Sequence, residues 1–63
     1  MQGDTYMKLF LNANDVMSIL DVKRSVAYNI IKELNGRLAE KGYDVIPGKV
    51  NRAYFEKCYM YHD

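Results

Sequence analysis

A cluster of basic and hydrogen-bonding side chains lies near the middle of this 63-residue chain. Lys23, Arg24 and Ser25 follow one another, and Asn29 and Lys32 come after them at helical spacing. Lysine and arginine bind phosphate oxygens, whereas the amide of asparagine can pair with N6 and N7 of adenine in the major groove. These residue types at this spacing predict recognition of double-stranded DNA.

Three residues before this cluster predict the corner of a helix-turn-helix. Leu20 ends an apolar stripe, Asp21 tolerates a left-handed backbone better than most residues, and Val22 can fill the corner. The second helix of such a motif presents its first turn to base edges. A plain helical hairpin with a charged, solvated corner is the alternative. Charge favours DNA binding, because residues 23–32 hold three basic residues and no acid.

Further DNA-contacting residues are predicted around the cluster and after it. Cations at a helix N-terminus oppose the helix dipole, so an anionic partner best explains Lys23 and Arg24. Tyr28 either donates its hydroxyl to a phosphate or packs half-buried. Lys49 and Arg52 flank a predicted strand, where they either grip the DNA backbone or minor groove or form only a charged hairpin tip. The predicted DNA-binding residues are Lys23, Arg24, Ser25, Tyr28, Asn29, Lys32, Lys49 and Arg52.

Apolar periodicity predicts the strand and the helix that precede the corner. Residues 8–11 are short and apolar, as expected of a strand. Asn12, with Asp15 three residues later, predicts the N-cap of a helix over residues 13–20. The apolar stripe of this helix is Ala13, Val16, Met17 and Leu20.

The second helix is expected over about residues 24–41 and should end at Gly42, a common residue after a helix. Gly36 interrupts the pattern at a cost of about 1 kcal/mol relative to alanine, so the helix either bends there or is shorter. One face must be buried, and it holds Ala27, Ile30, Ile31, Leu34 and Leu38. The polar side chains of the DNA-facing cluster lie on the opposite face.

Residues 43–50 favour β-structure on both sides of Pro47 and Gly48, a dipeptide typical of turns, and predict a hairpin. Asn51 can cap a last helix over residues 52–59, whose core-packing residues are Tyr54, Phe55, Cys58 and Tyr59. The order strand, helix, turn, helix, hairpin, helix predicts an α+β fold, a small winged helix-turn-helix in which the hairpin is the wing.

Length and composition limit the class of protein. A chain of 63 residues, 49% of them hydrophobic, is one domain with one small core, here with a flexible N-terminus at 1–6 and a tail at 60–63. Nine basic residues against eight acidic ones give a net charge of +1, so DNA binding should be local and weak. Cys58 is the single cysteine, which excludes an internal disulfide and fits the cytoplasm. No apolar run is long enough to span a membrane.

Neither a metal site nor a catalytic site is expected. Cys58 and His62 are four residues apart, but two ligands do not make a metal site, and the chain has no other Cys or His. The sequence holds no Ser/His/Asp set at plausible spacing, no glycine-rich phosphate loop and no acid pair in an evident pocket. We therefore expect neither an enzyme nor a bound cofactor.

Motifs along residues 9–59 resemble those of a known group of proteins. The motifs are Leu20-Asp21-Val22-Lys23 followed by Ser25, Tyr28 and Ile30-Ile31, then Lys41-Gly42-Tyr43, Gly48-Lys49 and Tyr54-Phe55-Glu56. In this order they resemble the small winged-helix DNA-binding proteins of the excisionase and MerR-like group, which phages and integrative elements carry. The resemblance implies an excisionase-type architectural factor or a small transcriptional regulator of a mobile element. In the excisionase case, several copies bind adjacent sites, bend the DNA and help a recombinase to choose excision.

Three residues depart from the pattern of that group. Asp21 stands in place of the turn glycine, and the turn survives because aspartate tolerates the left-handed backbone. Lys23 replaces the usual serine cap, which leaves the second helix without a good acceptor unless Asp21 or Ser25 supplies one. Asn29 stands where members commonly carry arginine, which replaces a guanine reader with an adenine reader.

Double-stranded DNA is the expected partner, together with further copies of the chain, as a dimer or in tandem, and a recombinase or another protein. No membrane partner is expected. A protein-interaction module, such as an inhibitor or adaptor encoded by a phage or an element, is the alternative, because +1 is a small charge for a DNA-binding protein. The apolar tail that starts at Tyr59 either folds back on the core or makes a subunit contact.

Overall fold

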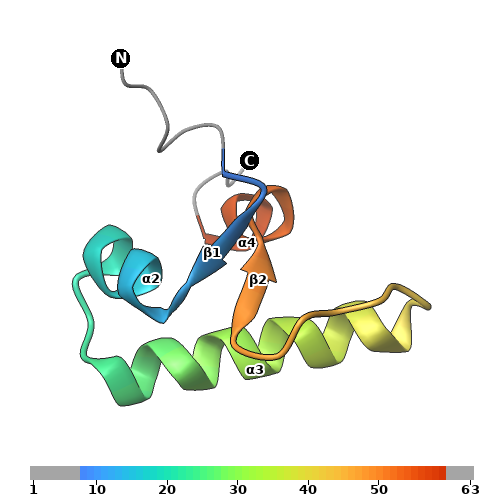
Figure 1. Ribbon diagram of the computed structural model, residues 1–63, viewed down its shortest axis with the longest axis horizontal. Helices are drawn as coiled ribbons and strands as arrows, with labels where there is room; N and C mark the ends of the chain where they lie inside the picture. Colours follow the sequence, from blue (N-terminus) through green and yellow to red (C-terminus); the bar gives the residue numbers. More distant parts are fainter. Residues whose placement is uncertain (1–7, 60–63) are drawn as a thin grey trace.

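Three helices and two short strands make up the part of the chain that the computed structural model describes, residues 8–59. The elements in chain order are β1 (Phe10–Asn12), α2 (Ala13–Leu20), α3 (Arg24–Glu40), β2 (Lys49–Asn51) and α4 (Arg52–Tyr59). Helix α3 runs along one side of the molecule, and both strands lie between it and α4, with α2 beside β1 (Figure 1). No helix among these elements is both long enough and apolar enough to cross a membrane. The predicted N-terminal segment 1–6 and tail 60–63 lie outside the described residues.

A reciprocal pair of hydrogen bonds begins α2, and a left-handed residue ends it. The backbone N–H of Asp15 donates to Oδ1 of Asn12 at 2.9 Å, and the N–H of Asn12 donates to Oδ2 of Asp15 at 3.0 Å. Asp21 has φ 56° and ψ 52°, and the N–H of Val22 donates to the carbonyl of Met17 at 3.2 Å. The predicted cap, helix bounds and left-handed corner are therefore confirmed.

Helix α3 is continuous across Gly36, so the shorter helix that the glycine allowed does not occur. The helix ends one residue before the predicted end, with Lys41 as its C-cap, and Gly42 has a φ of 92°. The predicted buried face is confirmed: the buried apolar residues are Ala27, Ile31, Leu34 and Leu38, and Ile30 packs against them partly buried. No side chain caps the N-terminus of α3 at Lys23, as the replacement of the usual serine predicts.

The predicted hairpin over residues 43–50 is wrong, although its turn forms. The N–H of Lys49 donates to the carbonyl of Ile46 at 3.0 Å across the turn, and Gly48 has a φ of 81°. Residues 43–46, however, form no strand. The partner of β2 is β1, which runs antiparallel to it and places Leu11 opposite Val50.

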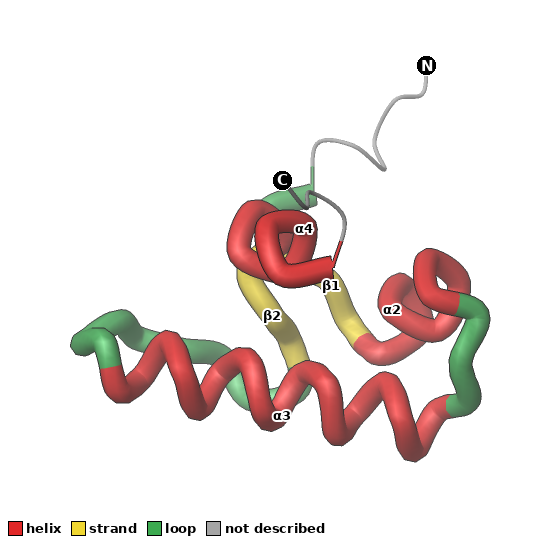
Figure 2. The backbone as a smooth tube through the Cα atoms, turned by 180° about the vertical axis from the view of Figure 1, so that it is seen from behind, coloured by secondary structure: helices red, strands yellow, loops and turns green. Residues whose placement is uncertain are grey.

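Burial explains why β2 pairs with β1 rather than with the segment before the turn. Leu11 and Val50 are 3% and 0% exposed, so this pairing removes two large apolar side chains from water, each worth about 1.5–3 kcal/mol. Tyr43 and Ile46 stay exposed, at 63% and 45%. The residues 43–48 instead form a loop that runs back along α3 before it reaches β2 (Figure 2).

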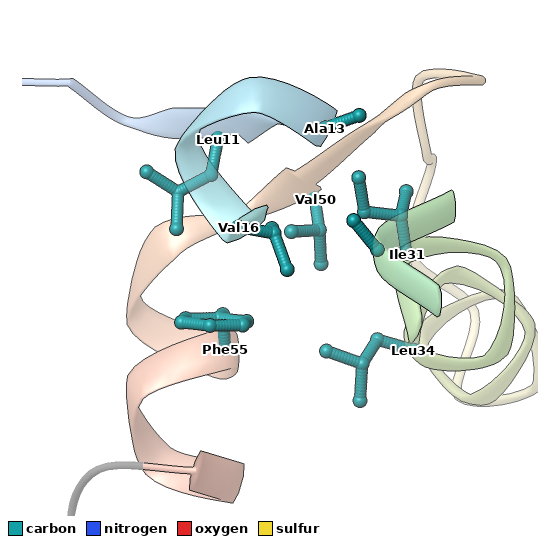
Figure 3. Close-up of a cluster of buried hydrophobic side chains, with 8 residues drawn as sticks. Leu11, Ala13, Val16, Ile31, Leu34, Val50 and Phe55 are labelled. Atoms are coloured by element: carbon teal, nitrogen blue, oxygen red, sulfur yellow. The ribbon is translucent and has the colours of Figure 1, made fainter. Parts of the chain in front are cut away.

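All five elements contribute to one core. Figure 3 shows the apolar side chains of both strands and all three helices directed toward one another. The buried cluster consists of Leu11, Ala13, Val16, Ala27, Ile31, Leu34, Val50 and Phe55. Phe55 is fully buried and fixes α4, with the ring of Tyr59 stacked on it at 5.3 Å between centroids. The core thus holds α3 with its polar face turned to solvent.

Candidate nucleic-acid interface

The predicted DNA-binding cluster is exposed on the polar face of α3. The core side of the helix holds Ala27, Ile31 and Leu34, each at most 1% exposed. The residues of the cluster are all exposed: Lys23, Arg24, Ser25, Tyr28, Asn29 and Lys32. Tyr28 is 47% exposed, so about half of its surface is open to solvent. The first turn of α3 holds no acid, so the positive end of the helix dipole and the basic side chains act in the same place.

Arg24 is positioned by a residue that the sequence did not single out. Its Nη2 donates to Oδ1 of Asn14, on α2, at 3.1 Å. An amide oxygen orients the guanidinium without neutralising its charge. Arg24 thus keeps its full charge while α2 limits where the side chain can point.

A groove between α3 and the following loop brings three of the predicted residues beside the turn. This feature, called the turn groove below, has a volume of about 370 Å³. Its lining residues are Tyr28, Asn29, Ile31, Lys32, Asn35, Val45, Pro47 and Gly48. Lys49 follows the turn directly and is exposed. The loop therefore takes the position beside the helix that the predicted hairpin wing was expected to take.

Asn35 holds this loop against α3, and sequence reasoning missed it. Its side chain is buried, and its Nδ2 donates to the carbonyl of Lys49 at 2.8 Å and to that of Ile46 at 3.2 Å. The available signal was an asparagine on the apolar face of a helix, between Ile31 and Leu38. A buried amide must find partners, and these two carbonyls accept its two N–H groups.

Arg52 is set apart from the other predicted residues. It begins α4, at the end of the sheet that faces away from α3 in both views (Figures 1 and 2). Its backbone N–H donates to the carbonyl of Leu9 at 2.9 Å, and its Nε lies 3.8 Å from Oε2 of Glu56. Arg52 is therefore not part of the turn groove.

Among the described residues, no ion pair joins a carboxylate to Lys49 or to the basic residues of the first half of α3. The ion pairs among residues 8–59 are Lys8–Asp15, Glu33–Arg37 and Arg52–Glu56. Burial raises the pKa of Asp15, but hydrogen bonds from Lys8 and from the backbone of Asn12 outweigh this effect and lower it. In the second half of α3, the hydrogen bond to Glu33 raises the pKa of Arg37. Among the described residues, Lys23, Arg24, Lys32 and Lys49 thus form no ion pair with a carboxylate, and the same holds for Lys41 and Lys57 elsewhere on the surface.

The described residues contain no candidate metal site. No three His, Cys, Asp or Glu side chains within residues 8–59 lie close enough to hold a metal ion. Cys58 is a free thiol of intermediate burial, and His62 lies outside the described residues. The exposed polar face of α3 can bind an anionic surface, because its side chains can reach both bases and phosphates.

Comparison with known proteins identifies a close relative. The chain is 54% identical over 52 residues to the ICEBs1 excisionase of Bacillus subtilis (strain 168), an alignment that covers 82% of this chain and 81% of the relative. No protein-family model matches the chain, and no solved structure matches it significantly. Identity at this level over most of both chains shows that the protein belongs to the family of the ICEBs1 excisionase.

Proposed function

We propose that this protein binds a specific sequence in double-stranded DNA as a winged helix-turn-helix and acts as the excisionase of an integrated mobile element. The observation that carries the proposal is the turn groove, where the exposed polar face of α3 and the Pro47-Gly48 turn border one surface. The identity to the ICEBs1 excisionase supports the same function independently. Such a protein works on DNA in the cytoplasm.

In the proposed complex, the first half of α3 lies in the major groove. Ser25 and Asn29 face base edges, and Asn29 pairs with N6 and N7 of an adenine, which contributes about 1–3 kcal/mol of discrimination. Lys23, Arg24 and Lys32 bind phosphates on either side. Lys49 reaches the backbone or the minor groove beside the turn, which serves as the wing.

The protein acts by shaping DNA rather than by chemistry. Several copies on adjacent sites bend the duplex and favour the arrangement in which a recombinase carries out excision. Bending a short site costs a few kcal/mol, on the order of 1–6. Contacts from the turn and between bound proteins offset this cost. Adjacent binding also compensates for the small net charge of +1.

The first experiment is sequence selection from random duplex DNA with the full chain, followed by anisotropy titrations of the selected site. Asn29→Ala and Arg24→Ala should each weaken specific binding by about tenfold or more. Arg37→Ala is the matched control, because Arg37 is exposed on the same helix but pairs with Glu33 away from the turn groove. If no motif is enriched, or if all three variants bind alike, the proposal is wrong.

A small transcriptional regulator would use the same surface of α3, so binding alone does not separate it from an excisionase. An excision assay with the selected site, the recombinase of the element and the purified chain separates the two. Excision that depends on the chain supports the excisionase. Normal excision without it, together with altered transcription from a nearby promoter, supports the regulator.

A further inference from the structure

A second groove lies toward the C-terminal end of α3 and shares Asn35 and Val45 with the turn groove. Called the α4 groove here, it has a volume of about 400 Å³ and is lined by residues of β1, α3, the loop, β2 and α4. Its sides and floor include Phe10, Leu38, Tyr43 and Tyr54, with Lys41 and Lys57 at its rim. None of the predicted DNA-binding residues lines it.

The lining of the α4 groove is apolar and aromatic. Leu38 is buried at 9% exposure, whereas Phe10 and Tyr43 are 36% and 63% exposed. Exposed rings around a concave surface present apolar area that a phosphate backbone cannot use. An apolar side chain that enters this groove would remove that area from water.

Two lysines make the rim basic. Nζ of Lys41 lies 5.3 Å from the centroid of the Tyr54 ring, and Lys57 follows Tyr54 by one turn of α4. Within the described residues, neither lysine forms an ion pair with a carboxylate. Asp44 lines the same groove, so two cations face one acid there. This charge fits a ligand that carries carboxylates.

We infer that the α4 groove docks a segment of a protein partner in which an aromatic or branched apolar side chain is flanked by Asp or Glu. The apolar side chain would lie against Phe10 and Leu38, and the carboxylates would meet the rim lysines. The exposed rings of this groove, and the absence of every predicted DNA-binding residue from its lining, favour such a peptide over DNA.

The position of the groove allows DNA and the partner to bind together. Helix α3 has 17 residues and spans about 25 Å at 1.5 Å per residue, with Arg24 at its start. The α4 groove uses only its second half, and although Asn35 and Val45 line both grooves, none of the predicted DNA-binding residues lines the α4 groove. A DNA-bound copy can therefore hold a second protein, such as a recombinase. To this extent the inference rests on the proposed function, although peptide binding itself does not require DNA.

The test is selection of a displayed random peptide library against the full chain, followed by anisotropy titration of the enriched peptides. Enriched peptides should place an aromatic or branched apolar residue beside Asp or Glu. Replacing that residue by alanine should weaken binding by about thirtyfold or more. Replacing the acids by Asn or Gln should weaken binding by about fivefold to tenfold.

Variants of the chain localise the site. Ala53→Leu fills the α4 groove from the exposed start of α4 and should weaken peptide binding by at least about tenfold. The double change Lys41→Gln and Lys57→Gln should weaken it by about tenfold. Lys32→Gln is the matched control for charge and should leave peptide binding unchanged. A thermal melt of each variant checks that the fold is kept.

Several outcomes would overturn the inference. One is a set of enriched peptides without an apolar anchor or without acids, and another is binding that Ala53→Leu does not affect. A dimer in sedimentation equilibrium that Ala53→Leu dissociates would assign the groove to a second copy. Stronger peptide binding in Tyr61→Ala would assign it to the chain's own C-terminus. Titration of the selected DNA with the same variants tests the proposed function separately, because Ala53→Leu should bind DNA normally.

Discussion

The two grooves of this protein are both lined by α3 and by the loop after it, and they differ in the groups that border them. The polar groups of the turn groove are the hydroxyl of Tyr28, the amide of Asn29 and the amine of Lys32, and the rest of its lining is largely apolar. The α4 groove is bordered mainly by rings and aliphatic carbons, with its cations at the rim. Asn35 and Val45 line both. The comparison teaches that a single fastened loop can give a very small domain two mainly apolar grooves that differ in their polar groups and in their exposed rings.

The fastening residue provides the largest test of this comparison. Asn35→Ala removes both donors to the carbonyls of Ile46 and Lys49, and we expect the free energy of unfolding to fall by about 2–3 kcal/mol. Because the loop borders both grooves, DNA binding and peptide binding should weaken together. Urea unfolding measures the first effect, and the two titrations measure the second.

Asn29→Ala is the control for Asn35→Ala, since Asn29 is an exposed asparagine on the same helix. It should change the free energy of unfolding by less than about 0.5 kcal/mol. It should also weaken DNA binding alone. Equal stability of the two variants would mean that Asn35 does not hold the loop and that the two grooves are formed independently of it.

Two glycines of the loop allow each groove to be disturbed alone, with a smaller effect. Gly48 and Gly42 have φ values of 81° and 92°, and a Cβ at either meets no atom within 4 Å, so substitution adds only backbone strain. Gly48→Ala and Gly42→Ala should each lower the free energy of unfolding by about 1–2 kcal/mol. Gly48→Ala should weaken chiefly DNA binding, and Gly42→Ala, beside Tyr43, chiefly peptide binding.

Gly36→Ala is the control for the two loop glycines. Gly36 lies inside α3, and a Cβ there also meets no atom within 4 Å. Alanine should therefore raise the free energy of unfolding by about 0.5–1 kcal/mol through helix propensity and leave both kinds of binding unchanged. Thermal melts measure all three variants. If Gly48→Ala and Gly42→Ala weakened both kinds of binding equally, the loop would act as one unit.

The parts of the structure that the sequence predicted are those that depend on neighbouring residues. The cap at Asn12 needs only Asp15, and the left-handed corner needs only a residue that tolerates it at Asp21. The pairing of β2 with β1 was missed, because it joins residues about forty positions apart, and the choice of partner depends on how Leu11 and Val50 fill a shared core.

The candidate site divides in the same way. The exposure of the α3 cluster followed from helical periodicity, since its residues lie opposite Ala27 and Ile31. The role of Asn35 did not follow, because its partners are carbonyls 11 and 14 residues later. The α4 groove is built from three separate stretches of the chain, so no local sequence pattern could predict it.

The smallest expected effect compares Lys49, which directly follows the turn, with Lys57, which lines the α4 groove. Lys49 and Lys57 are both exposed, and Lys49→Gln and Lys57→Gln change the net charge equally, so any effect of total charge on DNA binding is the same in both. If Lys49 binds a phosphate, Lys49→Gln should reduce the slope of log K against log salt by about 0.9. Lys57→Gln should leave the slope unchanged, because it faces the α4 groove. Anisotropy titrations of the selected duplex at several salt concentrations measure both slopes. Equal reductions of the slope would mean that DNA contacts both lysines. The assignment of DNA to the turn groove alone would then be wrong.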